Sequence, residues 1–230
     1  MIIGGIQKNS LIDYPEKISC VLFTSGCNFA CPYCHNPQLV KNNPNVCIKE
    51  TEIFDFLESH KNFLDGVVIS GGEPTIHDDI HFICKKIKAM GYSVKLDTNG
   101  SNPEVIKSLI DEELIDYIAM DIKTDPCRYS YFTIAGFDYV KILSSIQIIM
   151  NSKIKYEFRT TSVKPFVDVS VIEKISRIIS GASRYVIQHF HKNSVLMPEF
   201  FNTKNLELTE DEFYHMELAA KPFVNECIIR

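Results

Sequence analysis

The chain has 230 residues, of which 45% are hydrophobic and 23% charged, a composition typical of one globular domain rather than of a disordered or fibrous protein. Its formal net charge of −5 argues against nucleic acid as a partner, because nonspecific binding to nucleic acid depends on clustered Lys and Arg. No stretch approaches the ~18 apolar residues of a membrane span, and the beginning of the chain lacks the pattern of a signal peptide. We therefore expect a cytoplasmic protein without a membrane partner.

Six short runs rich in β-branched or aromatic residues predict β-strands. They are residues 18–24, 66–70, 93–98, 116–122, 154–163 and 184–190. Between these runs, apolar residues recur at helical spacing. Examples are Ile53-Phe56-Leu57, Ile80-Ile83-Ile87, Val105-Leu109-Ile110, Ile142-Ile146-Ile149 and Val171-Ile175-Ile178. The predicted order is therefore an alternation of strands and helices, which favours a parallel sheet with helical crossovers.

This alternation predicts an α/β fold, in the form of a partial, open six-strand β/α barrel. A closed eight-fold barrel needs ~250 residues, more than the six units occupy. We expect a single domain over residues 1–230, with a core at about residues 17–190 and a helical and extended tail at 198–230.

The tail carries one helix candidate, from Thr209 to Ala219. Thr209 as N-cap, with Glu212 three residues later, forms the pattern of a capping box. Residues 224–230 then end the chain as a candidate edge strand.

Cys27, Cys31 and Cys34 follow the first predicted strand in a C-x3-C-x2-C array. In a reducing cytoplasm, clustered cysteines indicate metal or redox chemistry rather than disulfides. A structural zinc site needs a fourth ligand, usually from a second cysteine pair; no such pair follows, and His35 is too close to Cys34 for an unstrained site. A four-iron cluster on three thiolates instead leaves one iron open to a small molecule.

The other five cysteines, at positions 20, 47, 84, 127 and 227, are expected to be buried or half-buried apolar residues.

Further candidate residues lie at the ends of the other predicted strands, where active sites of β/α barrels are built. They are Gly71, Gly72, Glu73, Asp97, Asn99, Asp121, Lys123, Arg159 and His189. Paired glycines let a ligand approach the backbone, but each short motif taken alone is equally typical of a turn or a helix N-cap. An exposed strand-end arginine and a hydrogen-bonded core histidine remain alternatives for Arg159 and His189.

The cysteine array, with the aromatic Tyr33 before its last cysteine, resembles the signature of the radical S-adenosylmethionine (radical SAM) superfamily. This resemblance implies an open six-strand barrel of the radical SAM type. It also implies a [4Fe-4S] cluster on Cys27, Cys31 and Cys34, whose fourth iron binds the methionine group of S-adenosylmethionine. One electron then cleaves this cosubstrate to methionine and a 5′-deoxyadenosyl radical. No side chain is expected to act as acid or base, because the cofactor carries the chemistry.

The other strand ends also resemble motifs of this superfamily. Gly71-Gly72-Glu73 is similar to the GGE motif, which binds the methionyl amino group. "LDTNG" (96–100) and "MDIK" (120–123) resemble the pyruvate formate-lyase activating enzymes, in which two aspartates hold a monovalent cation beside the cosubstrate carboxylate. The resemblance implies such a cation near Asp97 and Asp121, and it places Lys123 at the carboxylate. Further implied cosubstrate contacts are Asn99 at the ribose, Arg159 and His189.

Residues 4–40, which include the run Asp13-Tyr14-Pro15, are similar to the anaerobic ribonucleoside-triphosphate reductase activating proteins. That similarity implies hydrogen abstraction from a glycine of a partner, a glycyl radical enzyme such as anaerobic ribonucleotide reductase. Flavodoxin or ferredoxin is the implied electron donor.

Two alternatives stay open at this point. The first is a radical SAM enzyme that acts on a small molecule or peptide, as 7-carboxy-7-deazaguanine synthase does, with the aromatic segment 124–136 as a pocket wall. The second is a non-catalytic iron-sulfur or zinc-binding module.

Overall fold

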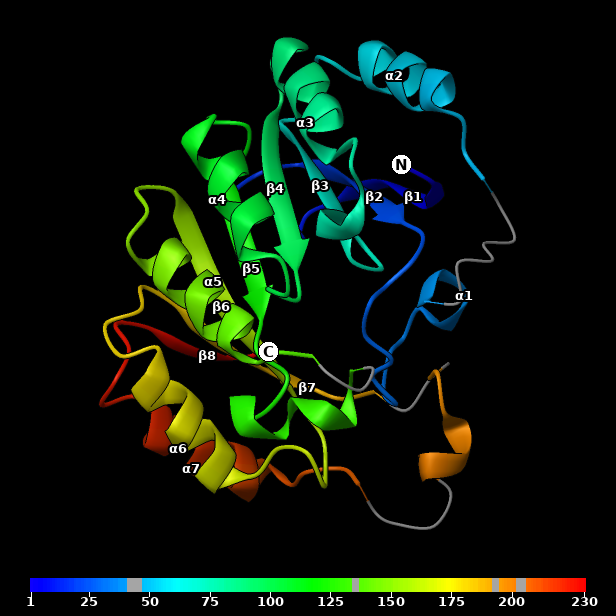
Figure 1. Ribbon diagram of the computed structural model, residues 1–230. Helices are drawn as coiled ribbons and strands as arrows, with labels where there is room; N and C mark the ends of the chain where they lie inside the picture. Colours follow the sequence, from blue (N-terminus) through cyan, green and yellow to red (C-terminus); the bar gives the residue numbers. More distant parts are fainter. Residues whose placement is uncertain (41–46, 134–136, 192–194, 202–205) are drawn as a thin grey trace.

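The computed structural model describes residues 1–40, 47–133, 137–191, 195–201 and 206–230 (Figure 1). These residues form one sheet in which the strands follow one another in chain order. The strands are β1 (Ile3–Ser10), β2 (Ser19–Thr24), β3 (Gly66–Gly71), β4 (Ser93–Thr98), β5 (Tyr117–Asp121), β6 (Lys155–Ser162), β7 (Tyr185–His189) and β8 (Cys227–Ile229). The α-helices are α1 (Pro37–Val40), α2 (Glu50–Ser59), α3 (Ile80–Ala89), α4 (Pro103–Asp111), α5 (Val140–Met150), α6 (Val169–Ile178) and α7 (Glu210–Ala220). The 3-10 helices are η1 (Pro74–Ile76), η2 (Pro126–Tyr131) and η3 (Pro198–Phe201).

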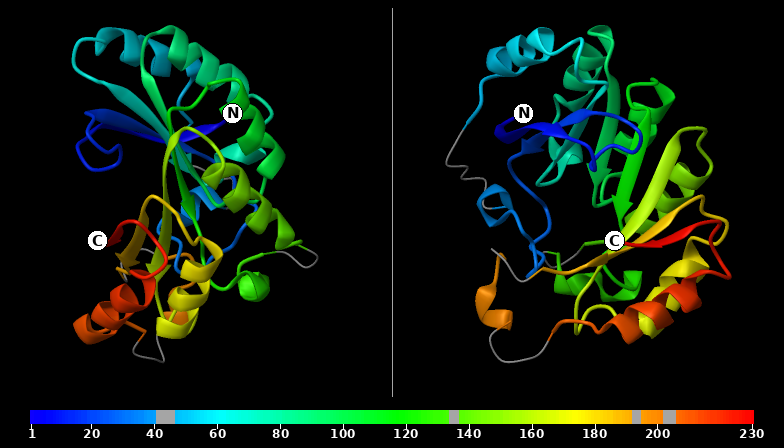
Figure 2. Two further views of the ribbon diagram at one scale, coloured as in Figure 1. Left: turned by 90° about the vertical axis from the view of Figure 1, so that its left-hand side faces the viewer. Right: turned by 180° about the vertical axis from the view of Figure 1, so that it is seen from behind.

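Strands β2 to β7 form the predicted parallel core, and helices connect each strand to the next. Figure 2 shows helices α3, α4 and α5 along one side of the curved sheet. Among the described residues, β1 and β8 do not pair with each other, so the sheet stays open. The prediction of an open α/β barrel with six parallel strands is therefore confirmed.

The two edges of the sheet differ in how well the sequence predicts them. The edge strand expected near the C-terminus is present as β8, parallel to β7. The tail helix is confirmed as α7, with Thr209 and Glu212 in a complete capping box. Strand β1, which pairs antiparallel with β2, was not predicted from the sequence. Its segment contains Gly4 and Gly5 and polar residues of low β-propensity, so the strand depends on its pairing with β2.

The run Asp13-Tyr14-Pro15 lies at the amino-terminal end of the barrel interior. Tyr14 is buried and packs with Val21, Val68 and Tyr117 in a small cluster separate from the main core. Side chains fill the interior of such barrels. Tyr14 and Pro15 also line a cavity of about 430 Å³ at this amino-terminal end. The cavity that the predicted site residues line is at the other end, where the parallel strands finish.

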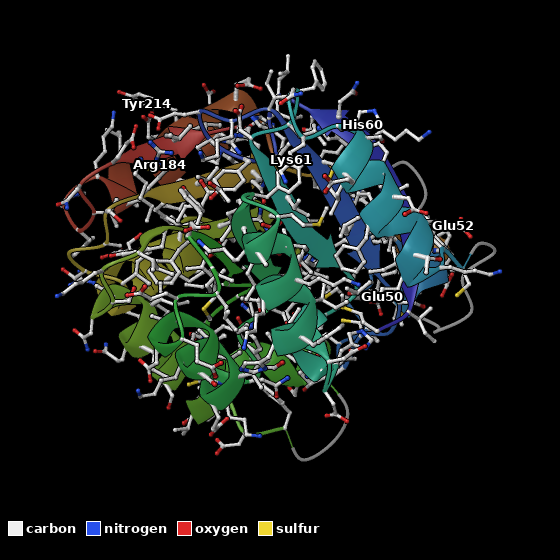
Figure 3. The ribbon with its side chains drawn as sticks, turned by 90° about the horizontal axis from the view of Figure 1, so that it is seen from above. Glu50, Glu52, His60, Lys61, Arg184 and Tyr214 are labelled. Carbon is white, nitrogen blue, oxygen red and sulfur yellow. The ribbon has the colours of Figure 1, made fainter. Side chains whose placement is uncertain are left out.

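The outer face of the sheet packs against the helices, whose polar sides face solvent. Glu52 and Lys61 near α2 and Tyr214 on α7 are exposed in this way (Figure 3). No helix in the described part of the chain is long and apolar enough to cross a membrane.

The five cysteines outside the array do not all have the expected burial. Cys20 and Cys84 are fully buried and Cys227 is half-buried, as expected. Cys47 and Cys127 are exposed, and for them the expectation was wrong. Both lie outside the sheet and the long helices, where no apolar face holds their side chains.

Candidate cofactor site

A cavity of about 200 Å³ lies at the carboxyl ends of strands β3 to β6. Its wall contains all the predicted site residues except His189. These are Cys27, Cys31, Tyr33, Cys34, Gly71, Gly72, Glu73, Asp97, Asn99, Asp121, Lys123 and Arg159. The fold thus brings together side chains from five strand ends that are up to 132 positions apart in the sequence, from Cys27 to Arg159.

The cysteine loop (residues 26–36) follows β2 and bends tightly enough to turn its thiols into this cavity. The amide of Cys34 donates to the carbonyl of Cys31 at 2.9 Å, and the amide of Phe29 contacts the Cys27 sulfur at 3.4 Å. The amide of Ala30 donates to the carbonyl of Phe132 at 2.7 Å, which ties the loop to the segment after η2.

Burial raises the pKa of Cys27 and of Cys31 to about 12 and also raises that of Cys34. The ammonium of Lys123 acts in the opposite direction on all three thiols. Thiolates are the metal-binding form of cysteine, so binding of a cluster must release protons from these buried groups.

The donor set of the cavity fits a cluster better than a single metal ion. In the described ranges, no three His, Cys, Asp or Glu side chains are grouped to hold one ion. A four-iron cluster distributes its thiolate ligands over different iron atoms, so it does not require the three sulfurs to converge on one point. The site therefore offers a cluster three thiols and no fourth cysteine.

The hydroxyl of Tyr33 indicates that the cavity also binds a polar ligand. It is buried and has no hydrogen-bond partner among the residues that the structure describes, although Tyr33 lines the cavity. A buried polar atom without a partner costs free energy. A polar molecule in the cavity would satisfy this hydroxyl, as S-adenosylmethionine could.

Gly71, the last residue of β3, lies close to the end of β2, and Gly72 lies close to the cysteine loop. Gly71 has a φ of +114°, which side chains other than glycine rarely adopt. A Cβ on Gly72 would lie 1.8 Å from the carbonyl oxygen of Gly26. The two loops are also joined by hydrogen bonds from Gly72 to Thr24 and from the Glu73 amide to Gly26.

The carboxylate of Glu73 is fully buried and connects the ends of β3 and β4. One oxygen accepts from the amide and hydroxyl of Thr75 and from the hydroxyl of Thr98, and the other accepts from the amide of Asn99 at 2.7 Å. Burial outweighs these hydrogen bonds and raises the pKa of Glu73 above its ordinary value. Because its second oxygen has a single donor, it can accept one more from an ammonium group.

A network of charged side chains joins β4, β5 and β6. The guanidinium of Arg159 donates to Asp121 at 2.8 Å and to Asp97 at 3.4 Å, and Lys123 donates to Asp121 at 2.8 Å. Burial opposes the charged forms, but Arg159 together with Lys95 holds the pKa of Asp97 below its ordinary value. Arg159 and Lys123 likewise hold the pKa of Asp121 well below its usual range.

Lys95 belongs to this network and was not predicted. Its side chain is 1% exposed, and its ammonium donates to Asp97. The sequence did contain a signal, because residues two apart in a strand share a face and Lys95 interrupts an apolar strand two positions before Asp97.

The remaining predicted residues lie as follows. Arg159 has only 14% of its side chain exposed, which rules out the alternative of an exposed strand-end arginine. Asn99 lines the cavity, but its amide is already bonded to Asn28 and to the backbone of Ser101.

The structure separates His189 from the other predicted site residues. It pairs in register with Ser162, one position beyond the cavity-lining Thr161, so its side chain points to the opposite face of the sheet. There its ring stacks on Phe213 of α7, with ring centroids 3.8 Å apart.

The small-molecule alternative expects the aromatic segment 124–136 to form a pocket wall. Its residues 124–133 do not line this cavity, and residues 134–136 lie outside the described ranges. Tyr129 and Phe132 are buried and pack edge-on with Phe29 and Tyr33 of the cysteine loop. Tyr129 and Phe132 therefore stabilise the cysteine loop from behind, and only their partners Phe29 and Tyr33 line the cavity.

The chain is similar in sequence to known proteins. Residues 21–177 match the family model of the radical SAM superfamily. The chain is 38% identical over 238 aligned positions to a protein of Methanocaldococcus jannaschii named as a candidate glycyl-radical enzyme activating enzyme, with 100% of this chain and 95% of that protein covered. It is 33% identical over 135 positions to the pyruvate formate-lyase-activating enzyme of Listeria monocytogenes, covering 53% and 52% of the two chains.

Solved structures share the fold. A radical SAM methyltransferase from Sphaerobacter thermophilus superposes with a TM-score of 0.65 at 13% identity, covering 94% of this chain and 67% of its own. The chain belongs to the radical SAM superfamily. It is accordingly a radical SAM enzyme, and this membership implies a [4Fe-4S] cluster and S-adenosylmethionine as cofactors.

Proposed function

We propose that this protein is a glycyl-radical enzyme activating enzyme. The observation that carries the proposal is the similarity over the full length of the chain to the relative from Methanocaldococcus jannaschii. The partial similarity to pyruvate formate-lyase-activating enzymes supports the same class. We further propose that residues 1–230 act as a single domain, because the site draws on strand ends along most of the chain.

In this proposal, Cys27, Cys31 and Cys34 hold the [4Fe-4S] cluster. When bound, the cluster and S-adenosylmethionine supply a one-electron cleavage of the C5′–S bond, which gives methionine and a 5′-deoxyadenosyl radical. That radical would abstract a hydrogen atom from a glycine Cα of the partner, which would leave 5′-deoxyadenosine and a glycyl radical. The protein itself contributes orientation and exclusion of water.

The side chains of the cavity have complementary roles toward the methionine group. Glu73 and the backbone of Gly71 and Gly72 bind its amino group, since a carboxylate is a strong acceptor for an ammonium. Lys123 and Arg159 bind its carboxylate with donors that Asp121 and Asp97 leave free.

Two further cavity residues bind the nucleoside part. The hydroxyl of Tyr33 forms a hydrogen bond with the ligand. Asn99 contacts the ribose once its side-chain amide gives up the hydrogen bond to Asn28. His189 is not included, because it faces the other side of the sheet.

We propose anaerobic ribonucleotide reductase as the partner, and flavodoxin or ferredoxin as the electron donor. The resemblance of residues 4–40 to the activating proteins of this reductase supports this choice. A location in the cytoplasm follows from the same proposal, because both the partner and the donor are cytoplasmic proteins.

The test is activation of the reductase in the absence of oxygen. The reconstituted protein, S-adenosylmethionine, a reductant and the reductase should give the doublet of a glycyl radical in electron paramagnetic resonance, and the radical should be lost when the reductase glycine is replaced by alanine. The matched control is Cys31→Ala, which should give no radical. Cleavage of S-adenosylmethionine without a radical on any glycyl radical enzyme supplied would contradict the proposal and favour a small-molecule substrate.

A further inference from the structure

The two aspartates of the site have no carboxylate oxygen free of a cationic partner. For Asp97, one oxygen accepts from Lys95 and the other from Arg159 at 3.4 Å and Ser70 at 3.2 Å. For Asp121, one oxygen accepts from Arg159 and the other from Lys123, each at 2.8 Å. A monovalent metal ion bound to any of these oxygens would lie beside an ammonium or guanidinium group.

The monovalent cation expected near Asp97 and Asp121 therefore does not fit this arrangement. The network contains three cationic side chains and two carboxylates. Another positive ion within hydrogen-bonding distance would be repelled strongly, because Coulomb interactions are large where water is largely excluded. The buried carboxylate of Glu157 also acts on Arg159, so the three cations are balanced by three carboxylates and no further positive charge is needed. Lys123 and Arg159 line the cavity, and the donors that the aspartates do not use suit an anionic group.

Lys95 is the member of the network that an ion could least easily displace from Asp97. It stands on the inner face of β4, in register with Val68 of β3 and Tyr117 of β5. The Tyr117 ring is 5.9 Å from the ammonium. If an ion displaced it from Asp97, the ammonium would be left buried among these side chains, and an unpaired buried charge is strongly unfavourable.

We propose that Lys95 replaces the monovalent metal ion: its tethered ammonium supplies the positive charge at Asp97 from inside the sheet. Asp97 then holds Arg159 in place, and Arg159 and Lys123 present their remaining donors to the carboxylate of the ligand. Lys95 is thus a positioning residue. Binding of S-adenosylmethionine by this protein does not depend on potassium or sodium. This inference rests on the proposed use of S-adenosylmethionine but not on the identity of the partner.

The test compares Lys95→Ser, which removes the charge and opens space for an ion, with the conservative Lys95→Arg. The dissociation constant of S-adenosylmethionine is measured by calorimetry on the anaerobically reconstituted proteins, in potassium, sodium or choline chloride at equal ionic strength. The wild type and Lys95→Arg should bind equally well in all three salts. Lys95→Ser should bind roughly tenfold more weakly in choline and regain affinity in potassium or sodium.

A second readout does not need the cluster. The melting temperature of the cluster-free Lys95→Ser protein should rise when potassium or sodium replaces choline, whereas that of the wild type should not. Lys88→Met is the matched control, because Lys88 pairs with Asp116 on the half-exposed outer side of the protein and should behave as the wild type.

Two results would overturn the inference. One is wild-type binding that strengthens roughly tenfold on addition of potassium or sodium. The other is a loss of affinity in Lys95→Ser that no monovalent ion restores. Absence of S-adenosylmethionine binding in every salt would instead contradict the proposed function, and the melting temperatures would still decide the role of Lys95.

Discussion

Cys31 and Cys84 are both buried, but their surroundings differ. Cys31 shares the cavity with two other cysteines and lies near the ammonium of Lys123. Cys84 lies on α3 in the main hydrophobic core, without a charged group among the causes that shift its pKa. We therefore propose that the same side chain serves as a cluster ligand at Cys31 and as an apolar packing residue at Cys84.

This difference gives a paired prediction. Cys31→Ala should abolish cluster binding and S-adenosylmethionine cleavage. Cys84→Ala should retain both and lose at most about 2 kcal/mol of stability. Iron and sulfide content after reconstitution, together with urea unfolding, measures the two effects. Equal loss of iron in both variants would contradict the assignment.

A pH dependence follows from the buried thiols outside the site. Burial raises the pKa of Cys20 and of Cys84 to about 12. The folded protein therefore keeps these protons at a pH where the unfolded chain has released them, so the free energy of unfolding falls as pH rises above about 8.5. Between about pH 8 and about pH 10, each thiol should account for a loss of roughly 2 kcal/mol.

Urea unfolding of the cluster-free protein at the two pH values measures this loss. Cys84→Ala should show a smaller decrease than the wild type by the contribution of one thiol. An identical decrease in both proteins would show that this thiol does not titrate on unfolding.

At the scale of the elements, the loops after β2 and β3 function as one unit. Gly72 lies against Gly26 so closely that no side chain fits, and backbone hydrogen bonds join the two loops. The position of the cysteines therefore depends on the glycines of the neighbouring loop. Glu73 extends the same unit to the end of β4 through the amide of Asn99.

Gly72→Ala should therefore separate the loops and lose both cluster and cosubstrate binding, at a cost of at least about 3 kcal/mol in stability. Gly5→Ala in β1 is the matched control, because its added Cβ would meet Phe23 at an ordinary 3.6 Å; its effect should stay within about 0.5 kcal/mol. Urea unfolding and iron content check both variants. Normal iron content in Gly72→Ala would contradict the coupling of the two loops.

At the scale of the whole molecule, the sequence predicts those features of the fold and the site that depend on a local pattern of residues. The six parallel strands are recognisable because each is a continuous apolar run covered by helices. The site residues are recognisable because they follow these runs directly, at the edge where parallel strands end. Radical SAM membership follows from the spacing of three cysteines.

The features that were missed depend on tertiary pairing. Strand β1 exists because β2 offers it a partner, and Tyr14 is fixed by the cluster that it closes. The face of the sheet on which His189 lies is set by its register with Ser162. The role of Lys95 becomes visible only from its contact with the carboxylate of Asp97. A one-residue difference in strand register is enough to move a side chain to the other face.

The central claim is that three cysteines in one cavity hold a cluster whose open iron binds and cleaves S-adenosylmethionine. The most direct measurement is anaerobic reconstitution with iron and sulfide, followed by addition of S-adenosylmethionine and a strong chemical reductant. The account predicts about four irons for each chain and the formation of methionine and 5′-deoxyadenosine in equal amounts. A protein that binds this iron but leaves S-adenosylmethionine intact under strong reductant would contradict the account.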